Sequence, residues 1–241
     1  MLCSDDNSHK SDIVYGINPH KKRTPFDSVQ EIEKEQGLWD IMAELPQYPY
    51  GVFGETGRVA GLDVGVISKW PITKTAMHRN SHTFTLDNGE EKLIARELIE
   101  ATIALPTGDE VIVFATHLVS KVTDPEGERR ENEARIIHDI IAQKEMEKPD
   151  ANIAFGGDLN DEPDSQPLAY LTEGGVLYNS TEGMHHDLIA TWNLQAAFDH
   201  ILHNANLKAH HQSSHRVCTG SVGHLNPSDH CAMVSVYQFG P

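Results

Sequence analysis

The sequence predicts one α+β domain over residues 1–241, and three observations carry this prediction. The chain has 241 residues, of which 39% are hydrophobic and 23% charged, as is typical of a globular domain. Segment 98–118 consists of two apolar runs around the turn Pro106-Thr107-Gly108-Asp109, which predicts an antiparallel hairpin. Few segments have helical spacing, so a layered sandwich is favoured over a regular repeat of strand, helix and strand.

The first part of the chain is expected to begin without regular structure, because residues 1–12 are polar. Residues 12–17 (DIVYGI) are rich in β-branched and aromatic side chains and predict a short strand. Two assignments are open for 24–45: a helix capped near Thr24, or a buried strand followed by a helix at 34–45. Periodicity alone does not choose between them.

Further elements follow in order. Residues 62–68 predict a strand that Pro71 ends. Between Glu126 and Lys148 apolar residues recur at helical spacing until Pro149, which predicts a long helix. The remaining expected elements are a strand at 152–157, a short helix near 165–173, and strands at 198–203 and 231–239.

Charge and composition limit the possible functions. A formal charge of −17 disfavours non-specific binding to polyanions, so phosphate chemistry would need local positive charge, most simply a metal ion. No apolar run approaches the roughly 18 residues that span a bilayer, so the chain is not expected to cross a membrane. The N-terminus has no signal-peptide core, and the compartment stays open, secreted or periplasmic locations included. Cys218 and Cys231 either pair outside the cytosol or remain thiols.

Polar residues at strand ends are the candidates for chemistry. Asp158 and Asn160 follow the strand "AFGG", and in an extended segment they would face one side while Leu159 enters the core. An acid and an amide together could orient water or hold a hydrated cation. The alternative is a turn in which Asp and Asn bond their own backbone. Asp229 and His230 precede the last strand, Asp199 lies in another, and His117 ends a third.

Several of these segments occur together in a fixed order: GLDVGVISKWPI (61–72), ATHLVSK (115–121), GGDLNDEPDSQPL (156–168), AFDHIL (197–202) and PSDH (227–230). In this order they resemble the endonuclease/exonuclease/phosphatase family, whose members include deoxyribonuclease I-like enzymes. Segment 29–50 looks like the family's "QEVEN" segment, and "GLDVGVIS" and "HLVSK" are similar to the branch that carries "GIDVALLS" and "HFKSK". The resemblance covers about residues 26–239.

The resemblance implies a four-layered α/β/β/α sandwich of two packed mixed sheets, with the active site at one end. It implies a monomeric hydrolase of phosphate esters that uses Mg²⁺ or Mn²⁺ and in-line attack by water. A nuclease acting on DNA or RNA is the first expectation, because the motifs match that branch. The acidic net charge favours a small phosphate ester as the substrate instead. A further alternative is that the protein is a non-catalytic relative that only binds its ligand.

The resemblance also suggests roles for individual residues. Glu31 would bind the metal, although it could instead face water on a helix. Asp229 would make a second metal contact or relay a proton to the leaving group. Asp158 would orient or deprotonate the attacking water and Asn160 would fix a water or a phosphoryl oxygen. His230, held cationic by Asp199, would stabilise charge at phosphorus, or a neutral ring would take a proton from water. The remaining candidates are His117 as a donor to a non-bridging oxygen, Asp63 as its orienting acid, and Arg96 and Lys121 as phosphate-binding cations.

The N-terminal part departs from the family pattern. Family members begin with a strand that carries an Asn, followed by a helix and then the strand with the Glu. Here Asn18 precedes Glu31 by only 13 positions, too few for a crossover helix between parallel strands. Either the first strand is missing or Asn18 has a different role. A second register would put Asn18 where the Glu belongs, but the spacing to Tyr48-Pro49-Tyr50 favours Glu31.

Overall fold

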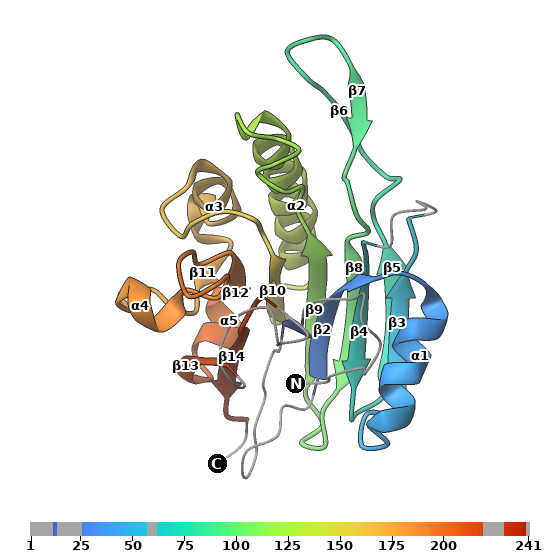
Figure 1. The fold of residues 1–241 in the computed structure, drawn as a ribbon. Coiled ribbons are helices and arrows are strands. Elements are labelled where there is room, and N and C mark those ends of the chain that lie inside the picture. Colours follow the sequence, from blue (N-terminus) through green and yellow to red (C-terminus); the bar gives the residue numbers. More distant parts are fainter. Residues whose placement is uncertain (1–11, 14–25, 57–61, 219–228, 240–241) are drawn as a thin grey trace.

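Two β-sheets pack face to face between two layers of helix (Figure 1). The computed structural model describes residues 12–13, 26–56, 62–218 and 229–239. The larger sheet has six strands in the order β11 (Tyr178–Asn179), β12 (Asp199–His203), β10 (Asn152–Asp158), β9 (Glu110–His117), β8 (Ile99–Ala104) and β5 (Ile72–Met77). In it β9 and β10 are parallel and the other neighbours are antiparallel, so the sheet is mixed.

The smaller sheet has four antiparallel strands, in the order β1 (Asp12–Ile13), β2 (Phe26–Ile32), β4 (Asp63–Ser68) and β3 (Tyr50–Gly54). Helix α1 (Glu35–Glu44) follows β2, so the second of the two assignments for 24–45, a strand and then a helix, is confirmed. Only Asp12–Ile13 of the strand expected at 12–17 is described. Asn18 and most of the expected loose start lie outside the described residues.

The layers are held by three apolar contacts. Leu38 of α1 packs on β2 and β4 at the outer face of the smaller sheet. Between the sheets, Val64 and Val66 of β4 meet Ile99 of β8. On the far side α2 (Glu128–Glu147) buries Ile137 and Ile141 against β9 and β10, close to α3 (Gln166–Leu171). Full burial of each such side chain stabilises the fold by about 1.5–3 kcal/mol. The expected α+β sandwich with four layers is therefore confirmed.

The expected hairpin at 98–118, the long helix and the later strands are also confirmed. The structure adds short elements: β6 (Thr83–Thr85) with β7 (Glu91–Leu93), β13 (His211–Val217) with β14 (Ala232–Tyr237), η1 (Glu173–Gly175), α4 (His186–Ile189) and α5 (Ala205–Lys208). Among the described residues no helix has the length and apolar character needed to cross a membrane.

One glycine allows β9 and β10 to approach closely. Gly157 has φ +148°, and a Cβ placed on it would lie 1.8 Å from the carbonyl oxygen of Thr116. Because no side chain fits there, only glycine keeps the two parallel strands in register up to their last residues. The polar residues His117 and Asp158, one position further along each strand, depend on that register.

Candidate active site

Sheet register brings three of the candidate residues to one edge. Asp158, the last residue of β10, pairs with His117, the last residue of the parallel strand β9. On its other side Asp158 pairs with Asp199, the first residue of the antiparallel strand β12. The ends of β9 and β10 and the start of β12 therefore lie at the same edge of the larger sheet.

His230 reaches this edge from the segment before β14. It forms an isolated bridge with Trp192, and its Nδ1 lies 2.7 Å from Oδ2 of Asp199. Its Nε2 lies 4.0 Å from Oδ2 of Asp158. Burial by itself lowers the pKa of the ring, but the carboxylate of Asp199, followed by those of Asp158 and Asp229, outweighs burial and raises the pKa of His230 to about 10. The imidazole is therefore cationic at neutral pH.

Asp158 and Asn160 form a tight turn at the end of β10. The Oδ1 atom of Asp158 accepts the backbone N–H of Asn160 at 2.9 Å, and Asn160 has φ +52°. Leu159 between them is fully buried, as expected. The local turn and the polar pair facing the site are thus both present, and the two interpretations of this segment do not exclude each other.

The carboxyl group of Asp158 has an unusual proton affinity. Burial and then the charge of Asp199 raise its pKa, with a smaller contribution from Glu31, while His230 and the Asn160 N–H lower it. The net effect raises the pKa of Asp158 to about 7. A carboxyl group with this pKa can accept or release a proton near neutral pH.

His117 is buried and neutral. The Nδ2 atom of Asn160 donates to the Leu118 carbonyl at 3.1 Å, which fixes the amide, and the same Nδ2 lies 3.1 Å from Nε2 of His117. Nε2 is therefore the acceptor and the proton resides on Nδ1. Burial and then the charges of Arg96 and His230 hold the pKa of His117 well below its usual value. Its Nδ1 has no hydrogen-bond partner within the described ranges.

Asp63 does not orient His117. Its Oδ1 accepts hydrogen bonds from Thr56, from the backbone N–H at 3.0 Å and from the hydroxyl at 2.6 Å. Asp63 and His117 both lie in the described part of the chain, and no hydrogen bond joins their side chains. The expected supporting role of Asp63 is therefore corrected: the carboxylate is committed to the end of β3 and the segment that follows it.

The site has the donor set of a divalent-cation site. Ligand atoms of Asp158, Asp199 and His230 lie within 4.8 Å of one another. The Oδ1 atom of Asp199 is buried and has no hydrogen-bond partner in the part of the chain that the structure describes. Because a buried carboxylate oxygen requires a partner, and because hard cations prefer oxygen ligands, the carboxylates of Asp158 and Asp199 fit such an ion, whereas the cationic ring of His230 would not bind it.

Glu31 and Asp229 lie near this cluster. Glu31 has φ +56° at an irregularity where the pairing of β2 with β4 shifts between Val29 and Ile32. It belongs to a strand, not to a solvated helix, and its charge acts on Asp158. The Oδ2 atom of Asp229 accepts from Nε1 of Trp192 at 3.3 Å, and its charge acts on His230.

A disulfide joins Cys218 to Cys231, so the predicted alternative of pairing is confirmed. Cys231 directly follows His230 in the chain. The bridge therefore closes a loop of sequence separation 13 that carries both Asp229 and His230. It ties that loop to the end of β13.

The two candidate phosphate-binding cations differ in their surroundings. Arg96 is buried, and its charge lowers the pKa of the nearby His117. Nζ of Lys121 lies 2.8 Å from Oδ1 of Asp161 and 5.3 Å from the centre of the Phe198 ring. Their contact with a phosphate stays a prediction.

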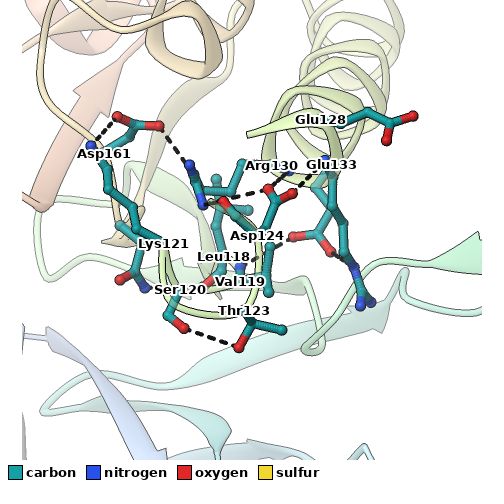
Figure 2. Close-up of polar contacts among 12 residues, drawn as sticks. Leu118, Val119, Ser120, Lys121, Thr123, Asp124, Glu128, Arg130, Glu133 and Asp161 are labelled. Carbon is teal, nitrogen blue, oxygen red and sulfur yellow. Dashed lines mark hydrogen bonds and ion pairs between the residues drawn. The ribbon is translucent and has the colours of Figure 1, made fainter. Parts of the chain in front are cut away.

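Two residues of this region were not predicted from the sequence. Figure 2 shows Asp161 between Lys121 and Arg130, with Arg130 at the start of α2. Asp161 directly follows Asn160, which is a signal that could have been used. Arg130 resembles any charged residue of an amphipathic helix, and only the folded arrangement distinguishes it.

This arrangement, a two-sheet sandwich with a His-Asp pair and buried carboxylates at one edge, is that of the deoxyribonuclease I-like class of proteins. The chain belongs to the Endonuclease/Exonuclease/phosphatase family, whose profile matches residues 28–230. The family name covers nucleases and phosphatases, enzymes that hydrolyse phosphate esters. No curated protein sequence matches the chain significantly.

Solved structures with the same fold include three distant proteins. Beta toxin 275-280 from Staphylococcus aureus has a TM-score of 0.64 and 16% identity, over 87% of this chain and 85% of that one. The human Nocturnin catalytic domain with bound sulfate has a TM-score of 0.63 and 15% identity, over 88% and 81%. D. rerio TDP2 complexed with a single-strand DNA product has a TM-score of 0.61 and 16% identity, over 86% and 83%. At these identities the likeness concerns the fold.

Proposed function

We propose that this chain, as one monomeric domain, is a divalent-metal-dependent phosphodiesterase that acts as a nuclease. The observation that carries the proposal is the convergence of His117, Asp158, Asp199 and His230 at one sheet edge, with His230 bonded to Asp199 at 2.7 Å. Membership of the family supports phosphate-ester hydrolysis in general. The DNA complex of the D. rerio protein supports the choice of a nucleic acid over other diesters.

Asp158 would orient the attacking water and accept its proton, since burial and its neighbours raise the pKa of this carboxyl to about 7. Asn160 would hold the water or a phosphoryl oxygen through its amide. Glu31, Asp229 and the free oxygen of Asp199 would hold Mg²⁺ or Mn²⁺. When bound, such an ion would neutralise negative charge on the phosphate and polarise a phosphoryl oxygen, which makes the phosphorus atom easier to attack.

His230 would lie against the phosphate, because its cationic ring, oriented by Asp199, matches the negative charge that develops on the phosphoryl oxygens. His117 would donate to a non-bridging oxygen; for this the proton would have to move to Nε2, the ring nitrogen that lies beside Asn160 and Asp158. Arg96 and Lys121 would add positive charge near the same group. Asp63 has no role in this proposal.

A small phosphate ester is the second candidate substrate, on two observations. The formal charge of −17 opposes the approach of a polynucleotide. A cavity of about 570 Å³ begins at Glu162, two residues after Asn160, and is bounded by Tyr178, Met184 and His186, which would suit a compact leaving group. A non-catalytic binding relative is the outcome if no ester is hydrolysed.

A substrate panel separates these functions. Purified protein is incubated with plasmid DNA, bis-p-nitrophenyl phosphate and p-nitrophenyl phosphate, each with Mg²⁺, Mn²⁺ or EDTA. Cleavage of the diesters that EDTA abolishes supports the nuclease. Turnover of the monoester alone supports a phosphatase, and no turnover with any ion, in protein that unfolds cooperatively, supports the binding relative.

A further inference from the structure

Arg130 is a buried cation in an unfavourable position. It lies in the first turn of α2, where the helix dipole disfavours positive charge, and it is 3% exposed. A buried guanidinium is tolerated only where its donors are paired. Its Nε donates to Oδ2 of Asp161 at 3.0 Å, and its Nη1 donates to the carbonyl of Asp124 at 2.7 Å (Figure 2).

Asp161 is shared between the two cations of this cluster. Its Oδ2 accepts from Arg130, while its Oδ1 lies 2.8 Å from Nζ of Lys121. Its backbone carbonyl lies 2.8 Å from Nε2 of His200 on β12. Asp161 is therefore fixed from helix α2, from the segment after β9 and from β12 at once.

The residue before Asp161 is the one that needs support. Asn160 has φ +52°, a conformation that persists in residues other than glycine where the surroundings determine it. In this conformation its N–H reaches Asp158 and its amide reaches His117 and Leu118. Leu118 begins the same segment that carries Lys121 and Asp124, so the contacts of Asp161 hold both segments that Asn160 connects.

We infer that Asp161, held by Arg130 and Lys121, is a positioning residue that keeps the amide of Asn160 against His117 and so sets the geometry of the proposed hydrolytic site. This inference rests on the proposed function only in its kinetic test, which requires that the protein hydrolyse a phosphate ester. The pairing of β10 with β9 and β12 ends at Asp158 and involves backbone groups, so it does not include the charged side chains of Asp161, Arg130 and Lys121. A purely structural ion pair would change stability without acting through Asn160.

The test compares Arg130→Met and Asp161→Asn with Arg135→Met, a matched control in the same helix whose guanidinium stacks on Tyr170 of α3. With bis-p-nitrophenyl phosphate and Mg²⁺ we expect both test variants to lower kcat by about 10- to 100-fold. KM should change by less than roughly threefold, because the lost interaction acts in the transition state. Arg135→Met should match wild type.

A double-mutant cycle with Asn160→Ala tests the route of the effect. If Arg130 acts through Asn160, Arg130→Met should cost little further activity in the Asn160→Ala background. The same full factor in both backgrounds would overturn the inference. If Arg130→Met fails to fold, Arg130→Lys serves instead, because it keeps the charge but cannot make both contacts, and an intermediate loss of kcat is expected.

A readout without turnover separates this inference from the proposed function. The side-chain amide of Asn160, assigned by its loss in Asn160→Ala, is followed by NMR. We expect two shifted, slowly exchanging N–H signals in wild type and Arg135→Met, and signals typical of a solvated amide in Arg130→Met. Unchanged amide signals in Arg130→Met would contradict the inference. Absence of turnover in wild type would contradict the proposed function alone.

Discussion

The Nδ1 atom of His230 lies 2.7 Å from Oδ2 of Asp199, although the two residues are 31 positions apart in the chain. Asp199 is fixed as the first residue of β12, opposite Asp158. His230 lies just before β14, next to the disulfide at Cys231. The pair therefore links the sheet edge to the C-terminal segment, and most of the proposed chemistry depends on it.

Asp199→Asn should lower the pKa of His230. In the metal-free protein burial opposes the charged ring, and the Asp199 carboxylate is the largest influence that raises the pKa to about 10. The NMR titration of the His230 ring is the measurement. Wild type should stay protonated well above pH 7, whereas Asp199→Asn should titrate at lower pH. Equal titration curves would show that Asp199 does not control the ring.

Much of the fold could be predicted because it is built from segments with strong patterns. The long helix has buried Ile137 and Ile141 at helical spacing and ends before Pro149. By contrast, β5 and β13 were not predicted: both are largely exposed, and no buried face gives them a regular alternation. The choice between helix and strand at 24–45 needed tertiary contacts with β4.

The candidate site was predicted in part, because motif order identified residues but not their partners. Asp158, Asp199 and His230 do meet. The expected partner of Asp63, His117, was wrong. The position of Asp63 in a strand does not indicate which neighbouring segment supplies a hydrogen-bond donor, and the donor is Thr56. The ion pair of Arg130 with Asp161 depends on how α2 packs over the sheet edge, which sequence spacing does not give.

Glu31→Gln should weaken binding of Mg²⁺ or Mn²⁺. Glu31 acts electrostatically on Asp158 and would supply one carboxylate oxygen to the ion, and loss of a full charge from such a site lowers affinity. Isothermal titration calorimetry with Mn²⁺ measures the change. Glu35→Gln, at an exposed position of α1, is the matched control and should bind as wild type does. If both variants bind equally well, Glu31 is not a ligand.

Reduction of the disulfide should destabilise the fold. A bridge that closes a loop of this size stabilises a protein by about 3 kcal/mol, mainly by restricting the unfolded chain. Urea unfolding with and without a reducing agent measures the difference, and activity should fall as well because Asp229 and His230 lie in the loop. The double variant Cys218→Ser, Cys231→Ser should be insensitive to the reductant; sensitivity equal to that of wild type would contradict this explanation.

His203 should make stability depend on pH below neutrality. Burial, followed by the charges of His211 and Lys208, lowers its pKa to about 3 in the folded protein, against 6.5 in the unfolded chain. The unfolded chain therefore takes up the proton first, and this contribution to stability is lost as pH falls from 6.5 towards 3.

The unfolding free energy at pH 7.5 and pH 5 tests this. His203→Gln should lose less stability between the two pH values than wild type does. His185→Gln is the control, because its ring is exposed, and it should follow the wild-type curve. A His203→Gln curve parallel to that of wild type would refute the assignment.

The most direct test of the central claim is the rate of bis-p-nitrophenyl phosphate hydrolysis by wild type, Asp158→Asn and Asp150→Asn, each with Mg²⁺ and with EDTA. Asp150 lies in the turn just before β10, at the opposite end of the strand from Asp158, and is exposed. We predict cation-dependent turnover by wild type and Asp150→Asn, and a loss of about 100-fold or more in Asp158→Asn. Turnover that survives both EDTA and Asp158→Asn would contradict the account.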